Sequence, residues 1–319
     1  MKKTVVVVNP MAANGSLGKR WPEVQKVLAR ELGAFEPVTT QGSRDATRLT
    51  REALAGGADV VVAIGGDGTT HEVVNGFFDG TRPLRPQAAL GLVPFGTGGD
   101  FRKTVGLGLD LAAACAVVKA GRTKKIDVGH LAYTATDGGR AETLFANIAS
   151  FGIGGLVDQL VNTSTKILGG KASFILATLR AGVRYKNQRV RIVFDGKEEE
   201  FVEAVINNVA VANGRYFGGG MFIAPRAELD DGQFDVVTVG DMTTWDFIVR
   251  GRHLYRGTHL DLAKVSCRRA ARVEARPTEP GQEVLLDVDG EAPGRLPATF
   301  TLLPGALSLI VPDGPNGKT

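Results

Sequence analysis

Residues 60–76 place an uninterrupted apolar strand directly before a glycine-rich corner and a helical pattern. The segment reads VVVAIGGDGTTHEVVNG, with five apolar residues ahead of Gly65, Gly66, Asp67 and Gly68. A strand without polar alternation is typical of a parallel sheet that is buried on both faces. Strands in such a sheet are joined by helices, so this one feature already favours an α/β fold.

The first 126 residues repeat this alternation of β-branched runs and helical patterns. Further strand-like runs occupy residues 4–10 and 89–96, and apolar residues recur at helical spacings of three and four in 21–33 and 111–121. We therefore expect residues 1–126 to form a doubly wound domain around a parallel sheet.

From residue 127 onward, short strands dominate. Asp-Gly pairs, which are typical of tight turns between antiparallel strands, occur at 195–196, 231–232 and 289–290. We expect residues 127–319 to form an antiparallel β-sandwich or barrel, interrupted by a helical pattern at 167–185. Two domains also agree with the length of 319 residues, because one hydrophobic core rarely serves more than about 250–300.

The composition limits the class of protein. The net charge of +4 and the pI near 9.1 favour anionic partners but are too mild to indicate nucleic acid. Cys115 and Cys267 lie too far apart to suggest a disulfide framework or a metal knuckle, which favours a reducing, cytoplasmic location. No apolar run approaches the roughly 18 residues of a membrane-spanning helix, so any membrane contact should be peripheral. The sequence leaves a homo-oligomer open.

Two glycine loops follow predicted strands of the first domain, at residues 65–68 and 96–100. A lone Gly-Gly pair is more often only a tight turn. Here Asp67 and Thr69 add a carboxylate and a hydroxyl, which is more chemistry than a turn needs. Backbone N–H groups beside a helix N-terminus favour an anion such as phosphate, although neither loop has the spacing of a P-loop or a dinucleotide site. We expect the two loops to line one crevice.

Several motifs occur in the order found in a known family. They are NP at 9–10, GGDGT at 65–69, PFGTGGDF at 94–101, NIASFGIGG at 147–155 and LDVDGEAPG at 286–294. With them the chain resembles the catalytic-domain family of diacylglycerol kinases, sphingosine kinases, ceramide kinases and bacterial lipid kinases. The resemblance spans nearly the whole chain, whereas GGDGT alone is also similar to NAD kinases and phosphofructokinases.

The resemblance implies that the first domain binds ATP. The implied residues are Asn9, Pro10, Met11, Ala12, Ala13, Thr40, Gly65, Gly66, Asp67, Gly68, Thr69, Thr70, His71 and Thr97. The assignment of Thr40 to the ATP site depends on its position in the family pattern alone, because a hydroxyl at a strand end usually bonds to nearby backbone. Two positions depart from the family pattern: Gly99 replaces the usual Asn, and His71 replaces the Asn of many bacterial members, which is closer to the sphingosine kinase form.

The resemblance also implies the catalytic residues, which are Glu291, Asp67 and Asp100. Taken alone, residues 287–291 are more typical of a solvent-facing hairpin. Glu291, however, matches the proposed general base of the family, and a carboxylate can accept the proton that a lipid hydroxyl loses as it attacks the γ-phosphate.

A magnesium site is implied in the second domain. Its ligands would be the Asp231 carboxylate and the backbone carbonyls of Glu228 and Gln233. Mg²⁺ prefers such oxygen ligands. Asp67 and Asp100 are expected to approach the same metal from the nucleotide side, through water.

Together these features predict an ATP- and Mg²⁺-dependent lipid kinase that transfers the γ-phosphate directly, without a phosphoenzyme. The lipid is expected at a membrane surface, where basic clusters at 180–191 and 250–256 could contact anionic lipid, although each cluster alone is more often solvated surface. Two alternatives stay open. One is an NAD kinase-like enzyme, and the other is a catalytically silent lipid- or nucleotide-binding protein, which Gly99 alone supports.

Overall fold

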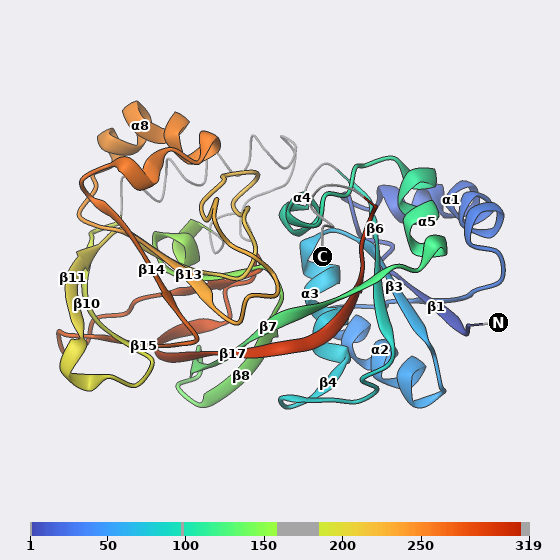
Figure 1. The fold of residues 1–319 in the computed structure, drawn as a ribbon, viewed down its shortest axis with the longest axis horizontal. Helices are drawn as coiled ribbons and strands as arrows, with labels where there is room; N and C mark the ends of the chain where they lie inside the picture. The colour runs from blue at the N-terminus through green and yellow to red at the C-terminus, as the bar shows by residue number, and fades with distance from the viewer. Residues whose placement is uncertain (1, 97–98, 158–184, 314–319) are drawn as a thin grey trace. The chain divides into compact units, whose positions relative to one another are not determined.

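The computed structural model describes residues 2–96, 99–157 and 185–313 (Figure 1). Its contacts divide the chain into two compact units. The first unit comprises Met1–Val128 and Pro304–Thr319, and the second comprises Gly129–Leu303. The sequence analysis instead assigned every residue after 126 to the second domain. The difference arises because the long strand β17 (Gly294–Ile310) carries the chain out of the second unit and back into the first.

The first unit is built on a parallel sheet, as the buried apolar runs predict. Its strands are β1 (Thr4–Val8), β2 (Glu36–Thr39), β3 (Val60–Gly65) and β6 (Ala89–Pro94). They are ordered β2-β1-β3-β6, and Ser308 and Leu309 of β17 add a further parallel partner beside β6. The direction of winding therefore reverses between β1 and β3. In open α/β sheets, ligands bind outside the carboxyl ends of the strands at such a reversal.

Helices cover both faces of this sheet, which confirms the doubly wound prediction. They are α1 (Ser16–Leu32), α2 (Asp45–Ala55), α3 (Asp67–Gly76), α4 (Asp100–Val105) and α5 (Leu111–Ala120), with a small hairpin of β4 (Phe78–Asp79) and β5 (Arg82–Pro83) after α3. Val6 and Val62 belong to one buried cluster with Leu28 of α1 and Val118 of α5. The alternate residues of β1 and β3 point to the opposite face, where α2 packs against α3.

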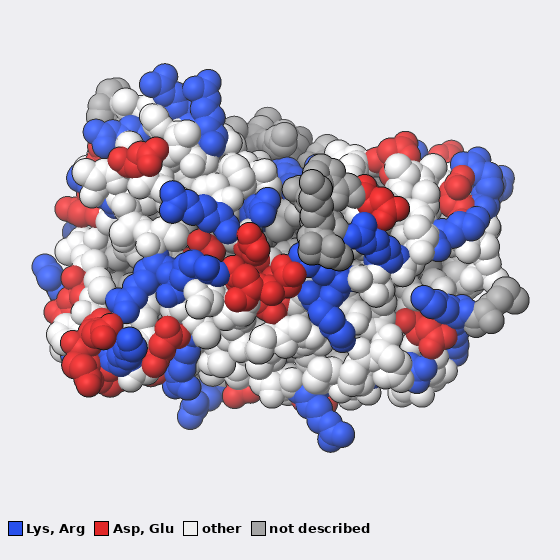
Figure 2. Space-filling view, in the orientation of Figure 1, with Lys and Arg blue, Asp and Glu red and all other residues white. Residues whose placement is uncertain are grey.

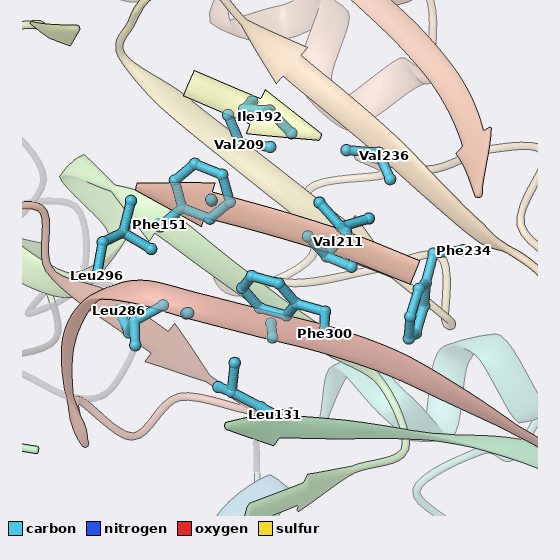
Figure 3. Close-up of a cluster of buried hydrophobic side chains, with 14 of the residues drawn as sticks. Leu131, Phe151, Ile192, Val209, Val211, Phe234, Val236, Leu286, Leu296 and Phe300 are labelled. Carbon is cyan, nitrogen blue, oxygen red and sulfur yellow. The ribbon is translucent and has the colours of Figure 1, made fainter. Parts of the chain in front are cut away.

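The second unit consists of antiparallel sheets around a shared core. One sheet contains β11 (Val202–Ile206), β10 (Gln188–Phe194), β15 (Arg272–Pro277) and β17, and β7 (Thr123–Ala135) pairs with β8 (Arg140–Phe145). The other sheet has the order β14 (Val265–Ala270), β13 (Phe234–Val239), β12 (Asn208–Ala212), β9 (Ile148–Gly152) and β16 (Leu286–Val288). Side chains from both sheets fill the core between them, as Figure 3 shows, and the rings of Phe151 and Phe300 stack with centroids 5.9 Å apart. The predicted sandwich is therefore confirmed.

Short elements and turns complete the second unit. It also contains α8 (Thr244–Arg256) and the 3₁₀ turns η2 (Glu198–Glu200) and η3 (His259–Asp261). Asp289 and Gly290 have φ angles of 51° and 89°, so both central residues of that turn are left-handed, as a type I′ hairpin requires. The helical pattern predicted at 167–185 falls almost wholly outside the described residues. Within the described ranges, no helix has the length and apolar character needed to cross a bilayer.

The close contact between α2 and α3 generates a stability prediction. A Cβ added at Gly76 of α3 would collide with Thr50 Cβ and lie 2.8 Å from the carbonyl oxygen of Thr47. We expect Gly76→Ala to lower the free energy of unfolding by about 1–3 kcal/mol, as overpacking does, even though alanine alone favours a helix. Gly42→Ala is the matched control, because its added Cβ would meet nothing within 4 Å. Urea denaturation measures both, and a Gly76→Ala protein as stable as the control would contradict the close approach.

Candidate active site

Asn9 links the loop after β1 to the loop after β3. Its Nδ2 donates to Thr69 Oγ1 at 3.0 Å, and its Oδ1 accepts the backbone N–H of Met11 at 3.0 Å. Thr69 is buried, and a Cβ at Gly65 would lie 2.5 Å from Thr69 Oγ1, so the strand end must be glycine for this contact to form. The bond spans the reversal between β1 and β3, where a ligand is expected.

The predicted segment Asn9–Ala13 also approaches the second glycine loop. Ala13 has a left-handed φ of 53°, and Gly96 has a φ of 112° that only glycine adopts readily. A Cβ at Gly96 would lie 3.1 Å from Ala13 Cβ, so the two backbones are nearly in contact. Met11, at the outer edge of this loop, is 73% exposed. The structure thus brings together the loops after β1, β3 and β6, although Thr97 lies outside the described residues.

Asp67 connects the two glycine loops directly. As the first residue of α3, it accepts the backbone N–H of Asp100 at Oδ2 (2.8 Å) and that of Phe101 at Oδ1 (3.3 Å). The residue before α4 is Gly99, which has no side chain to cap the helix. Asp67 therefore supplies the carboxylate cap for α4 from a neighbouring loop, where negative charge also complements the helix dipole.

Gly99 is explained by the backbone rather than by a lost function. Its φ is 100°, a backbone conformation that is strongly disfavoured for residues other than glycine. An added Cβ would also lie 3.2 Å from Arg102 Cδ. The predicted Asp100 is buried, and its carboxylate pairs with Lys103 Nζ at 2.7 Å. Sequence analysis did not select Lys103, although its position three residues after Asp100 on one helix is a usable signal.

A second carboxylate of α3 holds the loop that contains Thr40. Glu72 accepts the backbone N–H groups of Arg44 (2.8 Å) and Ala46 (3.0 Å) at the start of α2. Buried Thr40 extends the pairing of β1 and β2 through its N–H to Val8 O at 2.9 Å. Sequence analysis missed Glu72, because nothing local to residues 40–46 indicates a cap supplied by residue 72.

The remaining predicted residues lie on the first turns of α3. Thr70 Oγ1 donates to Gly66 O at 3.2 Å, and the His71 ring lies 3.4 Å from Asn75 Nδ2. Between the N-termini of α3 and α4 is a hollow of about 10 Å³, lined in part by Gly66, Asp67 and Gly99. It has room for about one water molecule. A larger anion would therefore bind against the outer surface of the glycine loops near the start of α3, because Asp67 already accepts the first N–H groups of α4.

Glu291 lies beside a rigid turn of the second unit. Backbone hydrogen bonds between Val288 and Glu291 close the turn in both directions, at 2.8 and 3.0 Å. Asp289 Oδ1 accepts the N–H of Ile148 at 3.0 Å, and Asp287 bonds to Gly290 N and to Ser150 Oγ, which fixes the turn against β9. Glu291 is exposed, and its carboxylate forms no hydrogen bond or ion pair with a described residue. The side chains of Asp287 and Asp289 therefore fix the turn, whereas that of Glu291 is exposed.

The predicted magnesium loop has a different arrangement. Asp231 Oδ1 accepts the N–H of Gln233 at 3.1 Å, and Oδ2 pairs with the Arg269 guanidinium from β14. Asp235 on β13 is buried, and that burial raises its pKa, so it offers no second open carboxylate. Among the residues with described positions, no group of three acidic, His or Cys side chains could hold a metal ion. The Arg269 guanidinium already neutralises the charge of Asp231 in this conformation. The assignment of Mg²⁺ to Glu228, Asp231 and Gln233 stays a prediction.

Comparison with known proteins finds a matching family model for each part of the chain. The model of the diacylglycerol kinase catalytic domain matches residues 3–131, and that of the YegS C-terminal NAD kinase beta sandwich-like domain matches residues 147–311. A diacylglycerol kinase of Bacillus subtilis is 29% identical over 98% of this chain and 97% of its own length. A Pseudomonas aeruginosa protein named "Probable lipid kinase YegS-like" is 31% identical over 98% of this chain and 95% of its own length.

Solved structures show the same similarity. A crystal structure of a Bacillus anthracis protein assigned to the diacylglycerol kinases has a TM-score of 0.75 at 26% identity and covers 98% of this chain and 95% of its own. Yeast NADH kinase in complex with NADH has a TM-score of 0.51 at 11% identity and covers 99% of this chain and 85% of its own. At 11% identity, the second comparison supports the fold alone.

The Asp67 cap generates a prediction for stability and nucleotide binding. We expect Asp67→Ala to lower the free energy of unfolding by about 0.5–2 kcal/mol, the usual effect of losing a helix cap, and to weaken nucleotide binding because the two glycine loops lose their common anchor. Asp67→Asn keeps one acceptor oxygen and should give an intermediate result. Urea denaturation and calorimetric titration with ATP measure the two effects. An alanine variant with wild-type stability and ATP affinity would contradict the role.

The Arg269 pairing generates a prediction for metal binding. We expect millimolar Mg²⁺ or a chelator to leave the melting temperature of the nucleotide-free protein unchanged, because a bound ion would have to displace a guanidinium held on the adjacent strand. In Arg269→Ala, Mg²⁺ should raise the melting temperature, since a ligand that binds only the folded state stabilises it. Arg268→Ala is the control, because Arg268 pairs with Glu200 instead, at 3.2 Å. Stabilisation of the wild type by Mg²⁺ would show that the metal binds without the substitution.

Proposed function

The chain belongs to the diacylglycerol kinase and YegS-like lipid kinase family, and we propose that it transfers the γ-phosphate of ATP to a hydroxyl of an amphiphilic lipid. The observation that carries this proposal is the capping of α4 by Asp67. That contact holds the loop after β3 beside the loop after β6, and a glycine-rich loop at the start of a helix such as α3 favours phosphate binding. The proposed acceptor is a diacylglycerol, a sphingoid base or a related lipid alcohol.

We assign ATP binding to the first unit. The glycine backbone at 65–68 lets phosphate oxygens approach bare N–H groups, and the helix dipole of α3 favours the negative charge. The hydrogen bond from Asn9 to Thr69 holds the loop after β1 beside the loop after β3. ATP enters as its Mg²⁺ complex, and this Mg²⁺ arrives with the substrate and supplies positive charge to the phosphates. Positioning and charge stabilisation account for most of the acceleration in this kind of reaction.

We assign to Glu291 the role of accepting the proton of the acceptor hydroxyl. As the lipid oxygen forms its bond to the γ-phosphorus, the bond from that phosphorus to the bridging oxygen of ADP breaks, and the hydroxyl proton moves to the Glu291 carboxylate. The transfer is direct, so no phosphoenzyme forms. The absence of any partner for this carboxylate among the described residues supports the assignment, because an ion-paired carboxylate would be a weaker base.

A substrate panel tests the proposed activity. We expect label from [γ-³²P]ATP to enter a lipid when the protein is incubated with detergent-dispersed diacylglycerol, sphingosine, ceramide or phosphatidylglycerol. NAD⁺ in the same panel tests the NAD kinase alternative, which rests on likeness of fold. ATP binding without transfer to any acceptor would instead favour a silent binding protein.

The role of Glu291 has its own test. We expect Glu291→Gln to lower kcat by about 100- to 10,000-fold, the usual contribution of a general base, and to leave ATP affinity unchanged, because the base does not hold the nucleotide. Glu279→Gln is the matched control, since Glu279 is also an exposed glutamate of the second unit. A Glu291→Gln enzyme with normal turnover removes the residue from this role.

A further inference from the structure

Helix α8 is anchored to the second unit through Leu254 and through its capped N-terminus. Leu254 is buried in a cluster with Ala210 of β12 and Ile223. The N-terminus is closed by a capping box, in which Thr243 and Asp246 bond to each other's backbone N–H groups. These contacts hold the helix at its start and through Leu254, and Figure 1 shows where α8 lies in the fold.

The exposed side of α8 combines basic and apolar residues. We call this set the α8 face, and its members are Val249, Arg250, Arg252, Tyr255 and Arg256. Val249 is 56% exposed, and Tyr255 is 52% exposed, which is unusual for side chains of this size in the second unit. Figure 2 shows basic side chains gathered over α8 at the upper left of the view.

The positive charge of the α8 face is not balanced within the described chain. Arg250, Arg252 and Arg256 form no ion pair with a described residue, whereas five other arginines of the second unit do. Those five are Arg191, Arg268, Arg269, Arg272 and Arg295. The one acid of the helix, Asp246, is used in the capping box and lies 3.5 Å from Lys264.

Helix stability does not explain this distribution. A basic residue in the last turn complements the helix dipole, and this accounts for Arg256. Arg250 and Arg252 lie earlier in the helix, and an exposed Val249 beside them weakens solubility without adding to the core. The other predicted basic cluster differs, because Arg191 pairs with Glu198 at 3.4 Å and its guanidinium lies 3.7 Å from the centre of the Phe201 ring. Residues 180–184 of that cluster lie outside the described residues.

We propose that the α8 face holds the enzyme on an anionic lipid bilayer. This inference rests on the proposed function, since a lipid kinase must meet its acceptor at a membrane. Arginines near a bilayer surface are attracted by anionic headgroups, and an aromatic or aliphatic side chain between them enters the interfacial region. A basic face that also carries Val249 and Tyr255 is complementary to a bilayer, which has negatively charged headgroups above an apolar interior.

Vesicle co-sedimentation tests the binding surface without any assay of catalysis. We expect the wild type to bind vesicles of phosphatidylcholine with phosphatidylglycerol, and to bind pure phosphatidylcholine weakly. Arg250→Ser/Arg252→Ser/Arg256→Ser should reduce binding to the anionic vesicles by about 100-fold, or about five-fold for each arginine. Added salt should weaken wild-type binding, because it screens these charges. Val249→Ser should weaken binding at every salt concentration.

A matched control separates the α8 face from net charge. Arg140→Ser/Arg272→Ser/Arg276→Ser removes three exposed arginines from β8 and β15 of the same unit. We expect this variant to bind anionic vesicles within about two-fold of the wild type, since its charges are placed elsewhere. The proposal would be overturned if both triple variants lost vesicle binding equally. It would also be overturned if the wild type did not bind anionic vesicles at low salt. Circular dichroism and thermal unfolding confirm that each variant is folded.

Activity assays distinguish failure of this inference from failure of the proposed function. We expect the α8 triple variant to lose activity on lipid presented in anionic vesicles but to retain wild-type kcat on detergent-dispersed lipid. Equal activity of variant and wild type on vesicles refutes the docking role and leaves the kinase assignment intact. If the wild type phosphorylates no detergent-dispersed lipid, the kinase assignment fails, and the sedimentation result still decides whether α8 binds membranes.

Discussion

Two carboxylates on one short helix organise the loops of the first unit. Asp67 caps α4, and Glu72, on the next turn of α3, caps α2. Each carboxylate accepts two backbone N–H groups that no intrahelical bond can satisfy, at a site where negative charge also complements the helix dipole. Helix α3 therefore determines where the loops after β2, β3 and β6 lie, and the proposed nucleotide site depends on these hydrogen bonds more than on any single loop conformation.

The glycines of the site follow from this arrangement. Gly65 leaves room for Thr69, and Gly96 lets its loop approach Ala13. Gly99 precedes α4, which is capped by the Asp67 side chain, so a capping side chain at position 99 is unnecessary. The φ of 100° at Gly99 also favours glycine. The replacement of the usual family Asn at this position is thus compatible with an intact site and gives little support to a loss of activity.

The fold was predictable from the sequence because it depends on patterns of neighbouring residues. Unbroken valine runs indicated the parallel sheet, and the Asp289-Gly290 pair indicated a tight turn between strands. Contacts between distant residues were not predictable in this way. Glu72 caps a helix that begins 27 residues earlier, and Arg269 reaches Asp231 only because β14 pairs with β13 beside the loop. The return of β17 to the first unit is likewise a property of topology, and its sequence resembles an ordinary strand.

The acids of the second unit differ in what surrounds each carboxylate, and this difference separates structural from chemical roles. Asp287 and Asp289 accept hydrogen bonds that fix the turn, and Asp231 is neutralised by Arg269. Glu291 lies at the end of the same turn, exposed and without a described partner. A carboxylate that already accepts hydrogen bonds or an ion pair has fewer oxygen lone pairs free for a ligand than one without such partners. Among the acids of this turn, Glu291 thus takes no part in fixing the turn through its side chain, which separates it from Asp287 and Asp289.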